Sequence, residues 1–160
     1  MPMHPDHSDI PTADDAPWMP LEGLIEQWAE LAQEATTPFL SKAVSAAFAA
    51  FSYEQEALAS YQLARTEHPL GTTAYWPSAL ETYEPTLDDL DRASKEWTAT
   101  AYALRSAAFG RDGVCLHRLR GLVTDALTER QRVCRIAHVV RAEQQARYHQ
   151  QKQQYQEARP

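Results

Sequence analysis

The chain is poor in glycine, in cysteine and in long apolar runs. Five glycines among 160 residues are few for a globular chain, and the abundant alanine favours helix. The sequence contains no run of 18 apolar residues, and its first 20 residues hold no basic region followed by an apolar stretch. Neither a membrane span nor a signal peptide is therefore expected. The length suits one domain, and the composition favours an all-α fold. Because no membrane span or signal peptide is expected, we expect the chain in the cytoplasm.

The only two cysteines, Cys115 and Cys134, fall in a segment that we expect to be one continuous helix. A helix would hold them about 28 Å apart, too far for a disulfide. Cys115 with His117 and Cys134 with His138 resemble a set of four zinc ligands. The same helix would keep the two pairs apart, so we expect no metal site and interpret Cys134 as a small, semi-buried hydrophobic residue.

Motifs that carry common enzyme chemistries are also missing. The chain has no Glu-x-x-His pair for a carboxylate-bridged di-metal centre. It has no glycine-rich phosphate loop, no Gly-x-Ser-x-Gly elbow and no His-Glu-x-x-His. We expect no bound cofactor and no enzymatic activity. An unrecognised helical-bundle enzyme, built from residues scattered along the chain, remains an alternative.

Apolar residues spaced three and four apart divide the chain into four helices. The predicted ranges are about 21–36, 38–67, 86–110 and from after Gly113 to about 157. Thr37 before Pro38 supplies an N-cap and a first-turn proline for the second helix, and Thr86 with Asp89 resembles a capping box for the third. A short turn of helix fits residues 78–83. We predict an up-and-down four-helix bundle with a long overhanging C-terminal helix.

Both ends of the chain are expected to lie outside this bundle, which should span residues 18–140. Residues 1–17 are rich in proline and aspartate and nearly devoid of large apolar side chains, which predicts a disordered segment that is dispensable for folding. The third predicted helix has about 24 residues, and the last helix is roughly 19 residues longer. Residues 141–160 are therefore expected to project as a polar helix.

Charge is unevenly divided along the chain. Residues 1–104 carry 17 acids and 4 bases, whereas residues 105–160 carry 5 acids and 11 bases. Glutamates recur every fourth position from Glu22 to Glu34, and such a like-charged stripe requires a basic neighbour.

The many arginines of the last helix raise the alternative of a nucleic-acid or anionic-membrane partner. At 100° per residue they fall around most of the helix rather than along one stripe. Antiparallel pairing would place residue 89 beside about 134, and so the acids at 88–96 beside Arg130, Arg132 and Arg135. This internal matching, with the net charge of −7, makes nucleic acid a less favoured partner. A membrane is also less favoured, because the apolar face already has a bundle partner and no stretch combines a lysine-rich face with exposed Phe, Leu and Trp.

The remaining features indicate protein binding. Tyr75, Trp76 and Tyr83 lie in the proline-rich connection at 68–85, and aromatic residues of this kind anchor interfaces, although a hydrophobic lid over the bundle explains them as well. Arg141, Tyr148 and Tyr155 recur every seven residues, a spacing typical of coiled coils. We expect a non-catalytic helical protein-binding module, such as an adaptor, assembly factor or regulator, that forms a homodimer through residues 141–157. A frayed, solvated tail is the alternative.

Overall fold

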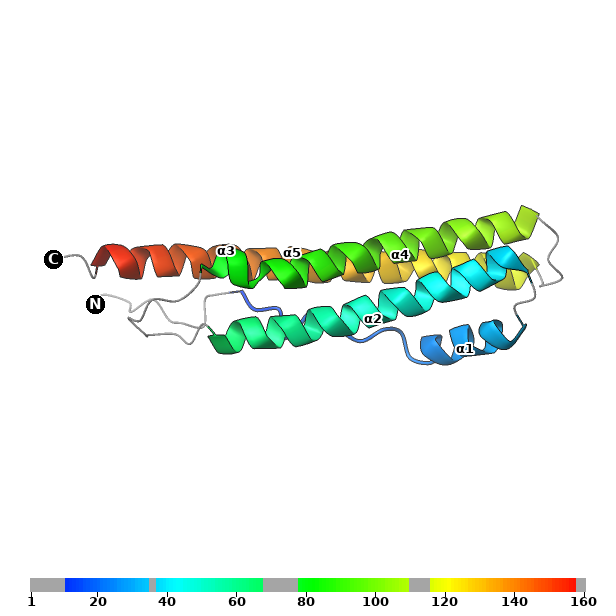
Figure 1. Cartoon of the computed structure of the whole chain (residues 1–160), viewed down its shortest axis with the longest axis horizontal. Coiled ribbons are helices and arrows are strands. Elements are labelled where there is room, and N and C mark those ends of the chain that lie inside the picture. Colours follow the sequence, from blue (N-terminus) through cyan, green and yellow to red (C-terminus); the bar gives the residue numbers. More distant parts are fainter. Residues whose placement is uncertain (1–10, 35–36, 68–77, 110–115, 158–160) are drawn as a thin grey trace.

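The computed structural model shows helices packed side by side in a long bundle (Figure 1). It describes residues 11–34, 37–67, 78–109 and 116–157. The helices are α1 (Leu24–Glu34), α2 (Pro38–Glu67), the single-turn α3 (Ala79–Thr82), α4 (Glu84–Phe109) and α5 (Leu116–Glu157). Within these ranges there is no strand, and the predicted all-α helical bundle is confirmed.

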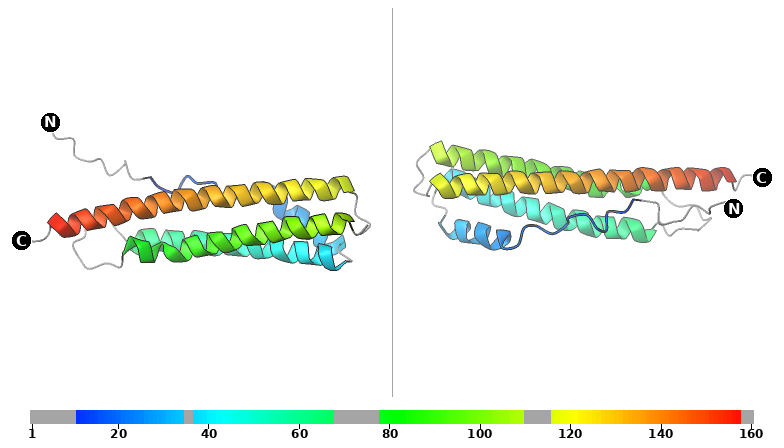
Figure 2. Two further views of the ribbon diagram at one scale, coloured as in Figure 1. Left: turned by 90° about the horizontal axis from the view of Figure 1, so that it is seen from above. Right: turned by 180° about the vertical axis from the view of Figure 1, so that it is seen from behind.

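The four longer helices alternate in direction along the bundle (Figures 1 and 2). Helix α4 packs along both α2 and α5. The fourth side is formed by two consecutive segments: the short α1 covers one end, and the non-helical residues 11–23 lie along the part beside it (Figure 2). The bundle is thus built from three long helices, with one side closed by the N-terminal part of the chain.

The helix starts follow from local capping. The Leu40 amide donates to Thr37 Oγ1 at 3.4 Å, and the Leu80 amide donates to Ser78 Oγ at 3.2 Å, as expected of N-cap residues. The predicted start of the third helix is wrong by two residues. Helix α4 begins at Glu84, so Thr86 lies inside its first turn, fully buried, and caps nothing.

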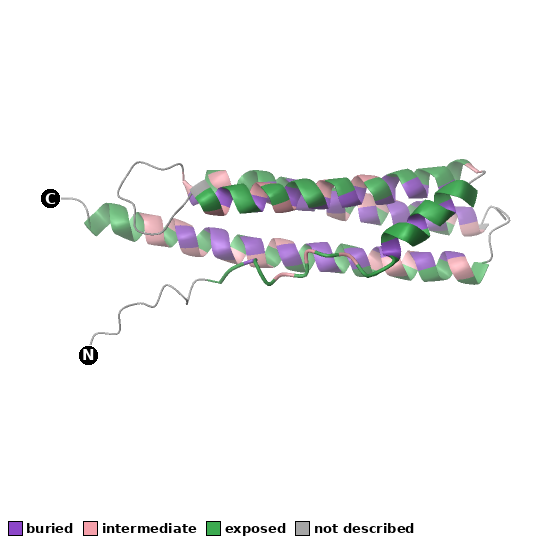
Figure 3. Ribbon diagram, turned by 90° about the horizontal axis from the view of Figure 1, so that it is seen from below, coloured by how far each residue is buried: buried purple, intermediate pink, exposed green. Residues whose placement is uncertain are grey.

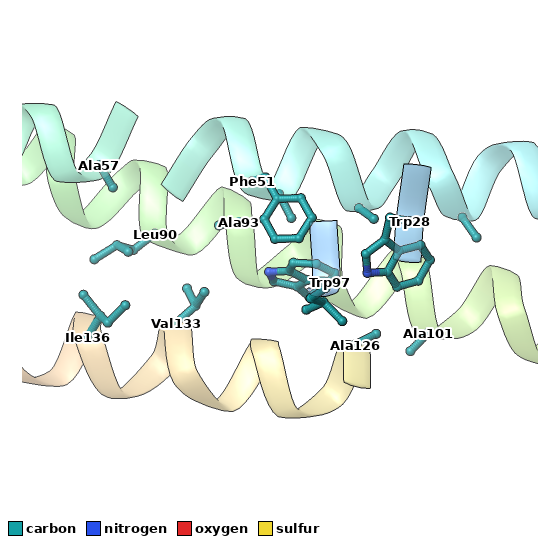
Figure 4. Packing of buried hydrophobic residues seen from close by; sticks show 14 of the residues in the cluster. Trp28, Phe51, Ala57, Leu90, Ala93, Trp97, Ala101, Ala126, Val133 and Ile136 are labelled. Carbon is teal, nitrogen blue, oxygen red and sulfur yellow. The ribbon is translucent and has the colours of Figure 1, made fainter. Parts of the chain in front are cut away.

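An aromatic cluster joins three helices at the centre of the core (Figure 4). The Trp97 ring of α4 lies 5.0 Å from the Phe51 ring of α2 and 6.2 Å from the Trp28 ring of α1, between centroids. Both tryptophans have no exposed surface. Burying a large apolar side chain stabilises a fold by about 1.5–3 kcal/mol, so this cluster is a main attachment of α1.

The N-terminal prediction is wrong for residues 11–17. Ala13 is fully buried, and its amide donates to the Tyr61 hydroxyl at 3.0 Å and to Glu143 Oε1 at 3.2 Å. Backbone groups bonded to buried side chains order this stretch, although it has few apolar side chains. Residues 1–10 lie outside the described residues.

The projecting part of the last helix is shorter than predicted. Glu143, Gln144 and Arg147 are buried, and Figure 3 shows burial continuing along α5 until its last turns. Helix α3 covers this part, because the Gln144 amide group donates to the Leu80 carbonyl at 2.9 Å. The Ala79 amide donates to the Gln151 side-chain oxygen, also at 2.9 Å. The fully exposed end of α5 is confined to residues 152–157.

Candidate functional site

A buried ionic cluster, called here the Arg132 cluster, joins α2, α4 and α5. Arg132 of α5 pairs with Glu54 of α2, and its Nε donates to Glu129 Oε2 at 2.7 Å. The other oxygen of Glu54 accepts a hydrogen bond from Trp97 Nε1 at 3.0 Å. Arg132 Nη1 also donates to the carbonyls of residues 17 and 18, both at 3.0 Å. The cluster therefore connects the three long helices to the N-terminal segment.

A second buried group, the Glu143 cluster, lies about three helical turns beyond Arg132 on α5. The Tyr61 hydroxyl of α2 donates to Glu143 Oε1 at 2.7 Å, beside the Ala13 amide described above. Arg147 Nε lies 3.8 Å from the other oxygen of Glu143, which has no exposed surface. Tyr83 is fully buried next to this carboxylate. This cluster holds α2, α5 and the N-terminal segment together.

Burial governs the protonation of both clusters. Desolvation raises the pKa of Glu54 above its ordinary value, although the positive charge of Arg132 opposes this. Burial and the Glu143 carboxylate raise the pKa of Tyr61 and of Tyr83. Both phenols are therefore neutral at ordinary pH, and Tyr61 donates its hydroxyl proton to Glu143.

The hydrogen bonds of the buried acids join separate parts of the fold. The oxygens of Glu54 and Glu129 accept hydrogen bonds from Trp97, Arg132 and the Leu21 amide. Three surface hollows of about 520, 580 and 570 Å³ are lined by other residues. Glu54, Glu129 and Glu143 line none of these three hollows. What the structure shows of the two clusters is that they hold the N-terminal segment.

The predicted partner-binding residues are dispersed. Tyr83 is fully buried, so its prediction as a surface anchor is wrong, because α3 turns it into the core between Tyr61 and α5. Tyr148 is half-buried and packs against the core, whereas Arg141 is exposed and Tyr155 is 67% exposed. Tyr75 and Trp76 lie outside the described residues.

Three of the four suggested metal ligands lie exposed on α5. Cys134, His117 and His138 are exposed, so Cys134 is not the semi-buried residue that was predicted, and Cys115 lies outside the described residues. Within the part of the chain that the structure describes, no three His, Cys, Asp or Glu side chains are grouped for a metal ion. Cys134 Sγ lies 3.7 Å from Ser94 Oγ, which shifts the predicted pairing of α4 with α5 by five residues.

Two arginines of α5 pair with acids of other helices. Arg118 pairs with Glu34 of α1, which supplies the basic neighbour expected for the glutamate stripe. The expected matching of the acids at 88–96 with Arg130, Arg132 and Arg135 is wrong. Asp89 and Asp91 pair within α4 instead, with Arg92 at 3.5 Å and Lys95 at 2.8 Å, and Arg132 turns inward to Glu54.

The other bases of α5 share its exposed side, which we call the basic face. At 100° per residue they lie within an arc of about 140°. The acids Glu129 and Glu143 are buried and Asp125 is half-buried, so no acid between Leu116 and Lys152 is fully exposed. The charged members of the basic face are Arg120, Arg130, Arg135, Arg141 and Lys152.

The buried charges were missed by sequence reasoning, although their spacing holds a signal. Glu54 continues the three-and-four spacing of core residues between Phe51 and Tyr61. Glu129 and Glu143 do the same on α5, where core positions follow at 119, 122, 126, 129, 133, 136, 140, 143 and 147. An acid at a core position of a helix is the pattern that predicts a buried ion pair.

Comparisons with known proteins give no match. No family model, curated protein or solved structure resembles this chain closely enough to be reported as similar. Across the described ranges, no helix has both the length and the apolar content that crossing a membrane requires. The functional conclusion therefore rests on the chemistry of the bundle itself.

Proposed function

We propose that this chain is a non-catalytic, cytoplasmic protein-binding module that docks the acidic surface of another protein on the basic face of α5. The observation that supports this is the separation of charge on α5. Its acids lie at buried or half-buried positions up to Lys152, while five bases remain exposed. From Arg120 to Lys152 the basic face extends over about 48 Å, enough for a partner helix of about 30 residues.

The spacing of the bases favours a protein over a nucleic acid. Successive charges from Arg120 to Lys152 lie roughly 8 to 17 Å apart along the helix axis, whereas duplex DNA carries a charge about every 1.7 Å. The net charge of −7 also repels a polyanion at long range. An acidic protein surface with scattered carboxylates matches this density better, and complementary charge of this kind speeds and orients association.

A membrane surface fits the basic face less well. Interfacial helices bury large apolar side chains beneath their basic residues. The exposed large apolar residues of α5 are Leu116 and Tyr155, which lie at either end of the helix, beyond Arg120 and Lys152. The basic face therefore lacks the apolar side chains that membrane insertion requires.

The experiment compares two full-length variants that change the charge equally. R135E/R141E reverses two bases of the basic face, and K42E/R105E reverses two exposed bases on α2 and α4. Each is used as bait in nuclease-treated extract of the native cell, with quantitative mass spectrometry against the wild type. We expect a defined acidic protein to be lost by R135E/R141E and kept by K42E/R105E, and its binding to weaken with added salt.

The same comparison can contradict the proposal. If every captured protein is retained equally by R135E/R141E, the basic face is not the docking surface. If purified wild-type chain instead binds duplex DNA tightly at physiological salt, and R135E/R141E abolishes that binding, the partner is a nucleic acid.

A further inference from the structure

Residues 11–23, called here the N-terminal strap, lie in a groove between α2 and α5. On the α2 side, Asp14 pairs with Arg65, and the Trp18 ring stacks on the Tyr61 ring at 5.4 Å. On the α5 side, the strap bonds to the Arg132 and Glu143 clusters through the backbone groups already described. The strap thus connects two helices that lie on opposite sides of it (Figure 2).

The strap runs antiparallel to α5 and contains a turn at residues 13–16, where the Ala16 amide donates to the Ala13 carbonyl at 3.2 Å. Its contact at Ala13 is with residue 143 and its contact at Leu21 is with residue 129. Fourteen residues of helix cover about 21 Å, and eight extended residues reach at most about 27 Å. Besides its local turn, this segment bonds to side chains more than 100 positions away in the chain, in the manner of a bound peptide.

The strap contributes few side chains to the apolar core. Ala13 is its one fully buried residue among the described positions, and Ala16 and Trp18 are partly buried against the core. Its other attachments are hydrogen bonds and an ion pair with charged side chains of α2 and α5. Segments of this kind belong to the less stable parts of a fold.

A hinge separates the strap from α1. Gly23 has a φ of +78°, in the left-handed region that favours glycine, and a Cβ added there would meet nothing within 4 Å. Backbone conformation rather than crowding therefore selects glycine at this position. The chain can change direction here without disturbing packed neighbours.

Large apolar side chains are left uncovered on both sides of this hinge. Met19 is 79% exposed, Leu21 is 56% exposed and Ile25 is 42% exposed. The spacing of apolar residues predicts Leu21 and Ile25 on a buried face, but the described residues leave both side chains exposed. We call these three residues the hinge cluster.

We propose that two copies of this chain exchange their straps, each strap lying in the α2–α5 groove of the other copy. The groove already fits this sequence, so every contact described above is kept in the exchanged dimer. Reciprocal exchange brings the two hinges together near the twofold axis, where each hinge cluster faces its copy. A second copy therefore explains both the groove and the uncovered apolar residues, whereas a different protein would explain only the first.

The exchange is expected to depend on protein concentration. A strap tethered to its own groove competes at an effective concentration of about millimolar. Covering one large apolar side chain at the hinge favours the dimer by about tenfold or more. Replacing Met19 and Leu21 with aspartate should thus raise the dimer dissociation constant at least about tenfold. Because both side chains are exposed, the monomer should be little affected.

The test uses full-length chains with Cys115→Ser and Ala16→Cys. Residue 16 and Cys134 line the same surface hollow, so a short bismaleimide can join a strap to the groove that holds it. Chains with natural nitrogen and with nitrogen-15 are mixed over a range of concentrations, cross-linked and digested. We expect linked peptides of mixed isotope between residues 16 and 134, and their share should rise with concentration.

Two matched variants check the cause. M19D/L21D should lower the mixed-isotope share at each concentration, while Y102D, on the exposed Tyr102 of α4, should leave it unchanged. Thermal melting confirms that each variant is folded. Linked peptides of a single isotope at every concentration would show that the strap stays in its own chain and overturn the proposal. A mixed share that is equal in M19D/L21D and the wild type would overturn it as well.

Discussion

Replacing Arg132 with methionine is the sharpest test of the buried ionic core. The substitution keeps an unbranched side chain but removes the cation that joins Glu54, Glu129 and the strap carbonyls. Two carboxylates are then buried near each other without a neutralising cation. Breaking a buried pair in this way costs about 3–5 kcal/mol, a large part of the 5–15 kcal/mol typical of a domain.

The measurement is urea unfolding followed by circular dichroism, at neutral pH. We expect R132M to lower the free energy of unfolding by about 4 kcal/mol and the melting temperature by about 8–16 °C. The matched control is R135M, three residues further on α5 and exposed, which should change the free energy of unfolding by less than about 0.5 kcal/mol.

A third variant separates the lost cation from the stranded acids. E54M/E129M/R132M removes all three charges, and neutral replacement of a buried triad restores stability in other folds. We expect it to recover about half of the loss, because Trp97 Nε1 and the Leu21 amide lose their acceptors. Hydrogen exchange at the Leu21 amide should be faster in this triple variant than in the wild type, because Glu129 no longer accepts its hydrogen bond. An R132M chain within 1 kcal/mol of the wild type, or a triple variant no more stable than R132M, would refute the reasoning.

Three further outcomes follow from single positions. Burial and a neighbouring carboxylate raise the pKa of Asp125, so the native state binds its proton more tightly than the unfolded chain and loses stability as pH rises through the native pKa. D125N should therefore melt about 1–2 °C higher than the wild type at pH 7, with no gain below about pH 3, as scanning calorimetry can check. W18A removes the ring that stacks on Tyr61 and should cost about 2 kcal/mol in urea unfolding. A cost below 0.5 kcal/mol would mean that the strap is not packed as described. R118A breaks a pair with Glu34 in which both side chains are partly exposed, and a double-mutant cycle with E34A should give a coupling below about 1 kcal/mol.

Much of the secondary structure could be predicted from the sequence because its causes are local. The start of α2 at Pro38 depends on Thr37 and the proline itself, and α5 continues to Glu157 because no proline or later glycine interrupts it. The short turn before α4 was likewise foreseen in the connection at 68–85. The first helix was predicted to begin at residue 21, but the positive φ of Gly23 delays it to Leu24.

The sequence alone thus determined that the chain is an all-α bundle and where most of its helices lie, since periodicity and capping act within a few residues. Only the tertiary structure decided which charges are buried and which are exposed. Glu143 and Ala13, for example, are 130 positions apart in the chain. Their hydrogen bond exists because the strap is held against α5, and that packing also turns Arg132 inward and leaves the basic face outside. No local pattern specifies such a contact, because the free energy of a buried charge depends on partners that folding brings from elsewhere in the chain.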